Sequence, residues 1–351
     1  MRYLNTIIFF LPLHFLLLLT GKAQPGLFDS DTVLDIKLHG NIKELISDRG
    51  VKSQYHPVTL SYATDTGDVQ APVRVKTRGH FRKAKSNCTY PPLLINTSDK
   101  NQQPSSLFYN QDKLKLVMPC RGDEFVVREW LVYKLYNVVT PKSFKARLVK
   151  VTLEEMDGKK KPGFYGILIE DDQKMAKRNG LLSIEKSGLR PEYTEKKEFL
   201  TMAVFEYMIG NTDWSVQYMQ NIRLIASDSF GIPATVPYDF DHSGIVNAPY
   251  ARPAEELQMS SVKERRYRGY CMNDMKTFDS VIALFNRVKK DLFEVFMNCS
   301  MLDAKYIRSM TNYLDDFYST INNPKKLEKE FRYPCDPNGT GNVVIKGLKE
   351  D

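Results

Sequence analysis

The chain reads NTDWSVQYMQNIRLIASDSFGIPATVPYDFD from residue 211 to residue 241. The pattern predicts a polar loop, a strand at 221–226, a turn, and a second strand at 234–238. Asp213 lies in the loop, and the second strand leads directly into Asp239 and Asp241. Because Mg²⁺ prefers oxygen ligands, these carboxylates indicate a metal or phosphate site at the end of the hairpin.

Short strands and helices alternate on both sides of this segment. The expected elements are strands at 33–38, 57–62, 73–77, 113–118, 146–153 and 163–169, and helices at 42–48, 123–137, 198–209, 278–296 and 303–321. The strands show a period of two residues or short apolar runs, and the helices show apolar residues at helical spacing. The composition, 42% hydrophobic and 26% charged over 351 residues, excludes a disordered or collagen-like chain.

Candidate phosphate-binding groups lie upstream of the acidic hairpin. The strand at 73–77 leads into RGHFR at 78–82, a tight turn rich in cations that includes Arg78 and Gly79. The next alternating strand places Lys113 and Lys115 on one face. This order, followed by a helix with a mid-helix glutamate and by two hairpins, is the order of parts in a protein-kinase-like ATP site.

The acidic and amide residues fit distinct roles in phosphoryl transfer. Asp213, in a loop just after a helix, is the candidate for the carboxylate that meets the incoming hydroxyl. Asn221 would be an amide metal ligand, Asp239 the main Mg²⁺ ligand, and Asp241 an assisting one.

Three motifs resemble the catalytic loop and metal motif of the spore-coat CotH-type atypical kinases and, more loosely, HipA-like kinases. They are NTDW at 211–214, Asn221-Ile222, and PYDFD at 237–241. The turn KTRGH at 76–80 resembles the Arg-Gly-Asn segment of CotH-type domains, with His80 in place of the asparagine. The similarity covers residues 73–245 and is closest to exported bacterial CotH-like proteins.

The resemblance implies an α+β, two-lobed protein-kinase-like fold, with a mixed N-terminal lobe built on an antiparallel sheet and a mostly helical C-terminal lobe. It implies ATP and Mg²⁺, or Mn²⁺, as cofactors and a protein hydroxyl as the phosphate acceptor. Lys115, or Lys113, would hold the α and β phosphates and pair with Glu129, while Arg78 and Gly79 of the turn would contact phosphates. Glu170 would lie at the hinge beside the adenine. The expected parts are a signal peptide at 1–23, a sheet-rich lobe at 24–172, a helical lobe with the catalytic and metal loops at 173–333, and a flexible tail at 334–351.

The N-terminus has the features of an export signal. Arg2 precedes an apolar run at 7–19, and the small-residue exit at 21–23 predicts cleavage near Ala23. The run is shorter than a spanning helix needs, although an uncleaved anchor is an alternative. We therefore expect a periplasmic or secreted protein with no transmembrane span in the mature chain. Loss of Arg2 and Lys22 lowers the formal net charge from +8 to +6, which suits anionic partners, and export disfavours nucleic acid.

The five cysteines indicate disulfides rather than a structural zinc site. They lie at positions 88, 120, 271, 299 and 335, and no pair has the Cys-x-x-Cys spacing. An oxidising compartment would give two disulfides and one free thiol. The sequence does not fix the pairing, but Cys88 and Cys120 flank the polar loop before the lysine strand and are the pair we expect.

Three classes of function remain open. The first is an exported phosphotransferase that acts on a protein of the cell envelope or exterior. The second is a non-catalytic envelope or surface scaffold, because ATP is scarce outside the cytoplasm. The joint presence of Asp213, Asn221 and Asp239 favours the enzyme, because a scaffold needs none of them. The third is a carbohydrate-processing enzyme with Asp213 and Asp239 as paired carboxylates.

A basic run follows the metal motif. It contains Lys263, Arg265, Arg266 and Arg268. Two interpretations stay open: a surface that attracts acidic substrates, and a solvated charged segment.

Overall fold

A computed structural model describes residues 26–64, 67–97, 106–272 and 274–333. The predicted signal peptide at 1–23 and the predicted tail at 334–351 lie outside the described residues. Within the described ranges, none of the helices has the length and apolar character that crossing a membrane requires.

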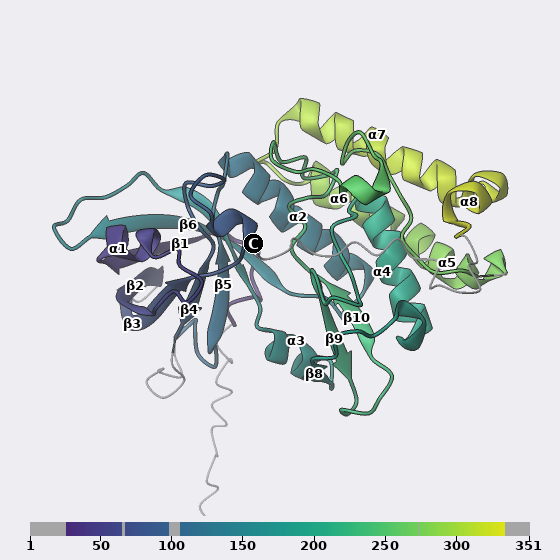
Figure 1. The fold of residues 1–351 in the computed structure, drawn as a ribbon. Coiled ribbons are helices and arrows are strands. Elements are labelled where there is room, and N and C mark those ends of the chain that lie inside the picture. The colour runs from purple at the N-terminus through teal and green to yellow at the C-terminus, as the bar shows by residue number, and fades with distance from the viewer. Residues whose placement is uncertain (1–25, 65–66, 98–105, 273, 334–351) are drawn as a thin grey trace, which may run out of the picture.

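Seven strands form a closed barrel in the order β1-β2-β3-β4-β5-β7-β6 (Figure 1). They are β1 (Leu34–Gly40), β2 (His56–Thr64), β3 (Gly67–Thr77), β4 (Leu93–Asn96), β5 (Lys113–Val117), β6 (Ala146–Glu155) and β7 (Phe164–Ile169). All neighbouring pairs are antiparallel except β1 and β6, which close the barrel as a parallel pair with Ile36 opposite Val151. Apolar side chains of alternate residues fill the barrel and form the first hydrophobic core.

A second hydrophobic core lies outside the barrel. Helix α2 (Asp123–Val139) packs against β6 and β7 on one side and against α6 (Lys289–Met297) on the other (Figure 1). Its run Trp130–Tyr133 is buried at every position, as expected for a helix enclosed between two layers. Helix α2 therefore connects the barrel to the C-terminal part of the chain.

The C-terminal part combines helices with a small separate sheet. The sheet has the order β10-β9-β8, with β8 (Leu182–Ile184), β9 (Ile222–Ala226) and β10 (Ala234–Pro237). The remaining α-helices are α1 (Ile42–Ser47), between the first two barrel strands, and α3 (Asp172–Arg178), α4 (Lys196–Ile209), α5 (Asp279–Arg287), α7 (Ala304–Ile321) and α8 (Pro324–Phe331). Short 3-10 helices are η1 (Phe81–Lys83), η3 (Pro191–Tyr193), η4 (Glu255–Leu257) and η5 (Met275–Phe278).

The predicted two-lobed protein-kinase-like fold is wrong. The N-terminal strands do not form an antiparallel sheet of one lobe but a closed seven-stranded barrel of mixed direction. The C-terminal part, predicted to be mostly helical with one hairpin, contains a separate sheet in which β8 joins that hairpin. The physical reason is that closure depends on the pairing of β1 with β6, two strands far apart in the chain. Local alternation identifies both strands but does not specify their partners.

The predicted disulfide between Cys88 and Cys120 is confirmed. The two residues are 32 positions apart and their Cα atoms lie 4.5 Å from each other. The bond joins the segment that follows the cationic turn to the loop between β5 and α2. Cys299 is a buried free thiol.

Candidate functional site

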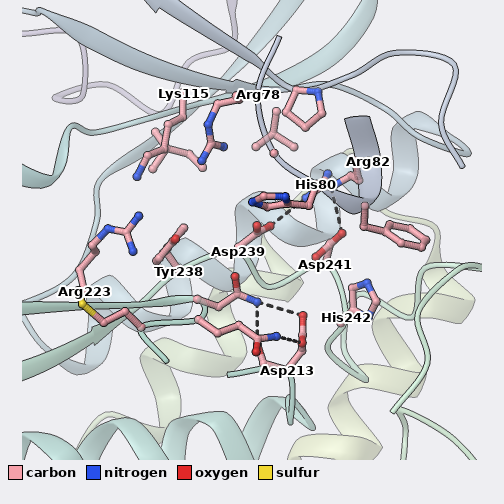
Figure 2. Close-up of a pocket in the computed structure, with 18 residues that line it drawn as sticks. Arg78, His80, Arg82, Lys115, Asp213, Arg223, Tyr238, Asp239, Asp241 and His242 are labelled. Carbon is pink, nitrogen blue, oxygen red and sulfur yellow. Dashed lines mark hydrogen bonds and ion pairs between the residues drawn. The ribbon is translucent and has the colours of Figure 1, made fainter. Parts of the chain in front are cut away.

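A pocket of about 450 Å³ lies between the barrel and the small sheet (Figure 2). The turn after β3, the middle of β5, the loop after α4 and the ends of β9 and β10 all contribute to it. Seven of the ten site residues that the sequence predicts line this pocket. They are Arg78, Gly79, Lys115, Asp213, Asn221, Asp239 and Asp241.

Cations form one wall of the pocket, at the top and left of Figure 2. Lys115 Nζ lies 2.6 Å from Asp172 Oδ1, and Arg223 Nε lies 2.6 Å from Asp172 Oδ2. Burial lowers the pKa of Lys115, and the nearby Arg78 and Arg223 also lower it, while Asp172 opposes them. The side chain of Arg78 makes no ion pair or hydrogen bond within the described residues. This wall therefore carries three cations and one carboxylate.

Carboxylates form the opposite wall, and a buried arginine holds them. Arg82 Nη2 lies 3.0 Å from Asp239 Oδ1 and 3.2 Å from Glu129 Oε2, and Arg82 Nε lies 3.0 Å from Asp241 Oδ2. Burial raises the pKa of Glu129 to about 8, although Arg82 opposes this. Burial also opposes the ionisation of Asp241, but Arg82 outweighs it and lowers the pKa of that carboxyl group. One guanidinium therefore contacts three carboxyl groups, and the raised pKa of Glu129 keeps that group mostly protonated near neutral pH.

Asp213 lies beside this acidic wall and is oriented by amide groups. Its Oδ1 accepts a hydrogen bond from Gln220 Nε2 at 2.5 Å, and its Oδ2 accepts one from Asn221 Nδ2 at 3.0 Å. Burial raises the pKa of Asp213, and the charges of Asp241 and Asp239 raise it further. A carboxylate with a raised proton affinity suits a group that accepts a proton from a hydroxyl.

The end of helix α4 determines where the loop that carries Asp213 begins. Gly210 ends the helix in the left-handed conformation, with φ of 68°. A Cβ atom at this position would lie 2.2 Å from Tyr313 Oη, so no larger residue fits. The next residue, Asn211, accepts a hydrogen bond from the backbone N–H of Asp213 at 3.1 Å through its Oδ1.

Backbone strain is concentrated at the pocket. Six non-glycine residues in the described ranges have positive φ, and three of them line it: Met219 (51°), Asn221 (52°) and Asp239 (64°). The surroundings hold these conformations, since Asp239 N donates to Tyr133 Oη at 3.0 Å and Asn221 O accepts from Tyr238 N at 3.0 Å. Such backbone conformations raise the free energy of the folded state, and they cluster at functional sites.

Three predicted site residues lie outside the pocket, and one predicted ion pair is absent. Lys115 does not pair with Glu129, because Asp172 binds Lys115 and Arg82 binds Glu129. Lys113 is exposed at the start of β5. Glu170 is buried beside the pocket, where its carboxylate accepts hydrogen bonds from the side chain of Arg178 and the backbone N–H of Lys145. It stabilises the junction of β6 and β7.

Sequence reasoning missed three charged residues of the site. Arg223 lies two positions after Asn221 on β9, so strand alternation could have placed both on one face. Arg82 belongs to the cationic turn but was not selected as a site residue. Asp172, at the end of the segment expected to form the hinge, begins α3 and bridges Lys115 and Arg223.

The oxygen atoms of the acidic wall fit a hard divalent cation. Asn221 Nδ2 donates both of its hydrogens to Asp213, which leaves Oδ1 as the ligand atom of Asn221. Gln220 Oε1 is buried and accepts no hydrogen bond from a described residue. The described residues contain no group of three or more His, Cys, Asp or Glu side chains placed to hold a metal ion. A cation here would rest on Asp239, Asp241 and an amide oxygen, as Mg²⁺ does when phosphates and water complete its shell.

Comparison with known proteins found no match that bears on the chemistry of the pocket. No protein-family model matches the chain, and no curated protein matches it.

Proposed function

We propose that this chain is a metal-dependent phosphotransferase that moves a phosphoryl group from Mg-ATP to a protein hydroxyl. The supporting observation is the charge polarity of the pocket. Arg78, Lys115 and Arg223 line one wall, and Asp239 and Asp241 line the other. A triphosphate with its cation has the matching polarity, because its oxygens are negative and the cation is positive.

The residues of the two walls have complementary roles in this proposal. Arg78, Lys115 and Arg223 would bind phosphate oxygens, with Asp172 fixing the last two through its ion pairs. Asp239 and Asp241 would hold Mg²⁺, together with an amide oxygen. When bound, the cation would neutralise negative charge on the triphosphate.

Asp213 would orient the acceptor hydroxyl and accept its proton. Its two oxygens already have fixed directions, because Gln220 and Asn221 donate to them. Burial raises its pKa, which makes it a better proton acceptor than an ordinary aspartate. The carboxylate is therefore both oriented and more basic than usual, as this role needs.

The segment at 211–241 supports the same activity through its resemblance to CotH-type kinases, and we include membership of that family in the proposal. Because the barrel differs from a protein-kinase-like fold, the overall fold does not support this activity, and the pocket is its main support. We place the acceptor in the cell envelope or exterior, since the N-terminal sequence has the features of an export signal. The disulfide between Cys88 and Cys120 suits an oxidising compartment.

A non-catalytic scaffold is the second candidate. Arg82 binds both Asp239 and Asp241, and amide side chains bind both oxygens of Asp213. Protein groups alone can therefore satisfy these carboxylates, which is what a scaffold without ligands would need.

Transfer of labelled phosphate from ATP separates the two candidates. The mature protein should label itself or an added acceptor protein when Mg²⁺ or Mn²⁺ is present. Asp213→Asn should still bind nucleotide but lose roughly 10²-fold or more of the transfer rate. The matched control is Asp315→Asn, an exposed carboxylate on α7, which should transfer like the parent. Equal rates for Asp213→Asn and the parent would remove Asp213 from the reaction, and no transfer by the parent would favour the scaffold.

A further inference from the structure

The basic run at 263–268 is neither a substrate-facing surface nor a solvated segment as a whole. The side chains of Arg265 and Arg268 are both about 6% exposed. Arg265 Nε donates to the carbonyl of Met208 at 3.1 Å, near the end of α4. Arg268 donates a hydrogen bond to the backbone of the loop that follows α4. Both arginines therefore bind backbone carbonyls within the protein.

Arg268 binds the backbone on each side of Asp213. Its Nη1 donates to the carbonyl of Thr212 at 2.8 Å and also to the carbonyl of Trp214. The guanidinium lies 4.8 Å from the centre of the Trp214 ring, in cation–π contact. Because one nitrogen binds the carbonyls of Thr212 and Trp214, it restrains the peptide plane that precedes Asp213 and the plane that follows Trp214, and so holds the chain on both sides of Asp213.

The loop needs such a donor because it belongs to no helix or strand. Asn211 and Thr212 are buried, and the carbonyl of a buried loop residue requires a hydrogen-bond partner. On the other side of the loop, Gln220 and Asn221 hold the carboxylate of Asp213. Asp213 is thus fixed at its side chain by amides and at its backbone by Arg268.

We infer that Arg268 is a positioning residue of the proposed active site, which holds the backbone around Asp213 and so sets the direction of its carboxylate. The role of Asp213 as a base rests on the proposed function, whereas the anchoring of the loop does not. Lysine is a poor substitute, because its compact ammonium group has no planar surface to stack on the Trp214 indole and its shorter side chain does not reach the position of Nη1.

Hydrogen exchange of the backbone amides tests the anchoring directly. In Arg268→Lys, the amides of residues 211–221 should exchange about tenfold faster or more, because hydrogen bonds from a charged donor are lost. The amides of β6 should keep the parent rate. The matched control is Arg265→Lys, in the same run, which should affect the end of α4 and leave residues 211–221 unchanged.

Phosphate transfer provides a second readout. In Arg268→Lys, kcat should fall while the KM for ATP stays at the parent value, because the nucleotide contacts are intact. Arg268→Gln, which keeps a donor but no charge, guards against failure of one variant to fold. Unchanged exchange at 211–221 in both variants would overturn the inference, as would a uniform rise over the barrel and α4. If the parent transfers no phosphate, the proposed function fails, while the exchange rates still decide whether Arg268 anchors the loop.

Discussion

Replacement of Glu206 by glutamine should remove a defined part of the pH dependence of stability. Glu206 lies on α4 and is 1% exposed. No hydrogen bond of ordinary geometry from a described residue reaches its carboxyl oxygens, and the nearby Asn211 side chain only partly opposes the effect of burial on its pKa. Burial raises the pKa of Glu206 from 4.5 to about 8, and the charge of Asp213 contributes in the same sense.

The size of the effect follows from the two pKa values. Between pH 4.5 and about 8 the folded protein keeps the proton on Glu206, while the unfolded chain releases it. The contribution of Glu206 to the free energy of unfolding is therefore fully present below pH 4.5 and is lost as the pH rises through this window. At about 1.36 kcal/mol for each pH unit, the loss reaches about 5 kcal/mol as an upper bound. Glutamine carries no titrating proton, so this contribution disappears in the variant.

Urea unfolding at a series of pH values from about 5 to 8.5 measures this contribution. The difference in free energy of unfolding between Glu206→Gln and the parent should grow in favour of the variant as the pH rises. Glu129 contributes to the pH dependence in both proteins, so it cancels in this difference. The control is Glu198→Gln, which removes the same charge from the same helix and should keep the slope of the parent. A parallel pH dependence for Glu206→Gln and the parent would refute the reasoning.

Four further substitutions test three other features of the structure: the disulfide, the buried arginine and the strained backbone at Asp239. Cys88→Ser and Cys120→Ser should each lower the free energy of unfolding by about 3–4 kcal/mol, because the disulfide closes a loop of 32 residues. The double variant should be no less stable than either single variant. Recovery of both cysteines of the parent as free thiols in non-reducing peptide maps would contradict this. Arg82→Met should destabilise the protein by about 3–5 kcal/mol at neutral pH, because buried carboxylates lose their cation. Added Mg²⁺ should recover part of the melting temperature that this variant loses. If the variant without Mg²⁺ melts at the same temperature as the parent, Arg82 does not stabilise the buried carboxylates. Tyr133→Phe should cost about 1–3 kcal/mol in chemical denaturation, because the strained Asp239 loses the acceptor of its backbone N–H; no loss would show that this hydrogen bond is dispensable.

Local sequence patterns predicted the elements of this fold but not how they assemble. The strands at 113–118 and 221–226 and the helix at 123–137 correspond closely to β5, β9 and α2, because alternation and helical periodicity are local properties. The parallel pairing of β1 with β6 joins distant parts of the chain and leaves no local mark. The predicted helix at 278–296 also divides at Val288 into α5 and α6, which its continuous apolar spacing did not indicate.

The candidate site was predictable where its residues share one hairpin. Asn221 and Asp239 come together because β9 and β10 are consecutive strands that pair antiparallel, with Ile222 opposite Pro237. The partner of Glu129 was not predictable, because Arg82 reaches it from a turn that the barrel brings to α2. Ion pairs between distant segments depend on tertiary packing, so residue order alone does not determine them.

We propose that the polarised pocket binds ATP together with a divalent cation. Calorimetric titration of the protein with ATP, with and without Mg²⁺, measures this binding. We predict saturable binding that Mg²⁺ strengthens, with the same behaviour in Asp228→Asn, an exposed acid on the turn between β9 and β10. Asp239→Asn should lose only the part of the affinity that depends on Mg²⁺. Binding of ATP by Asp239→Asn with the Mg²⁺ dependence of the parent, or no binding of ATP by the parent, would contradict the account.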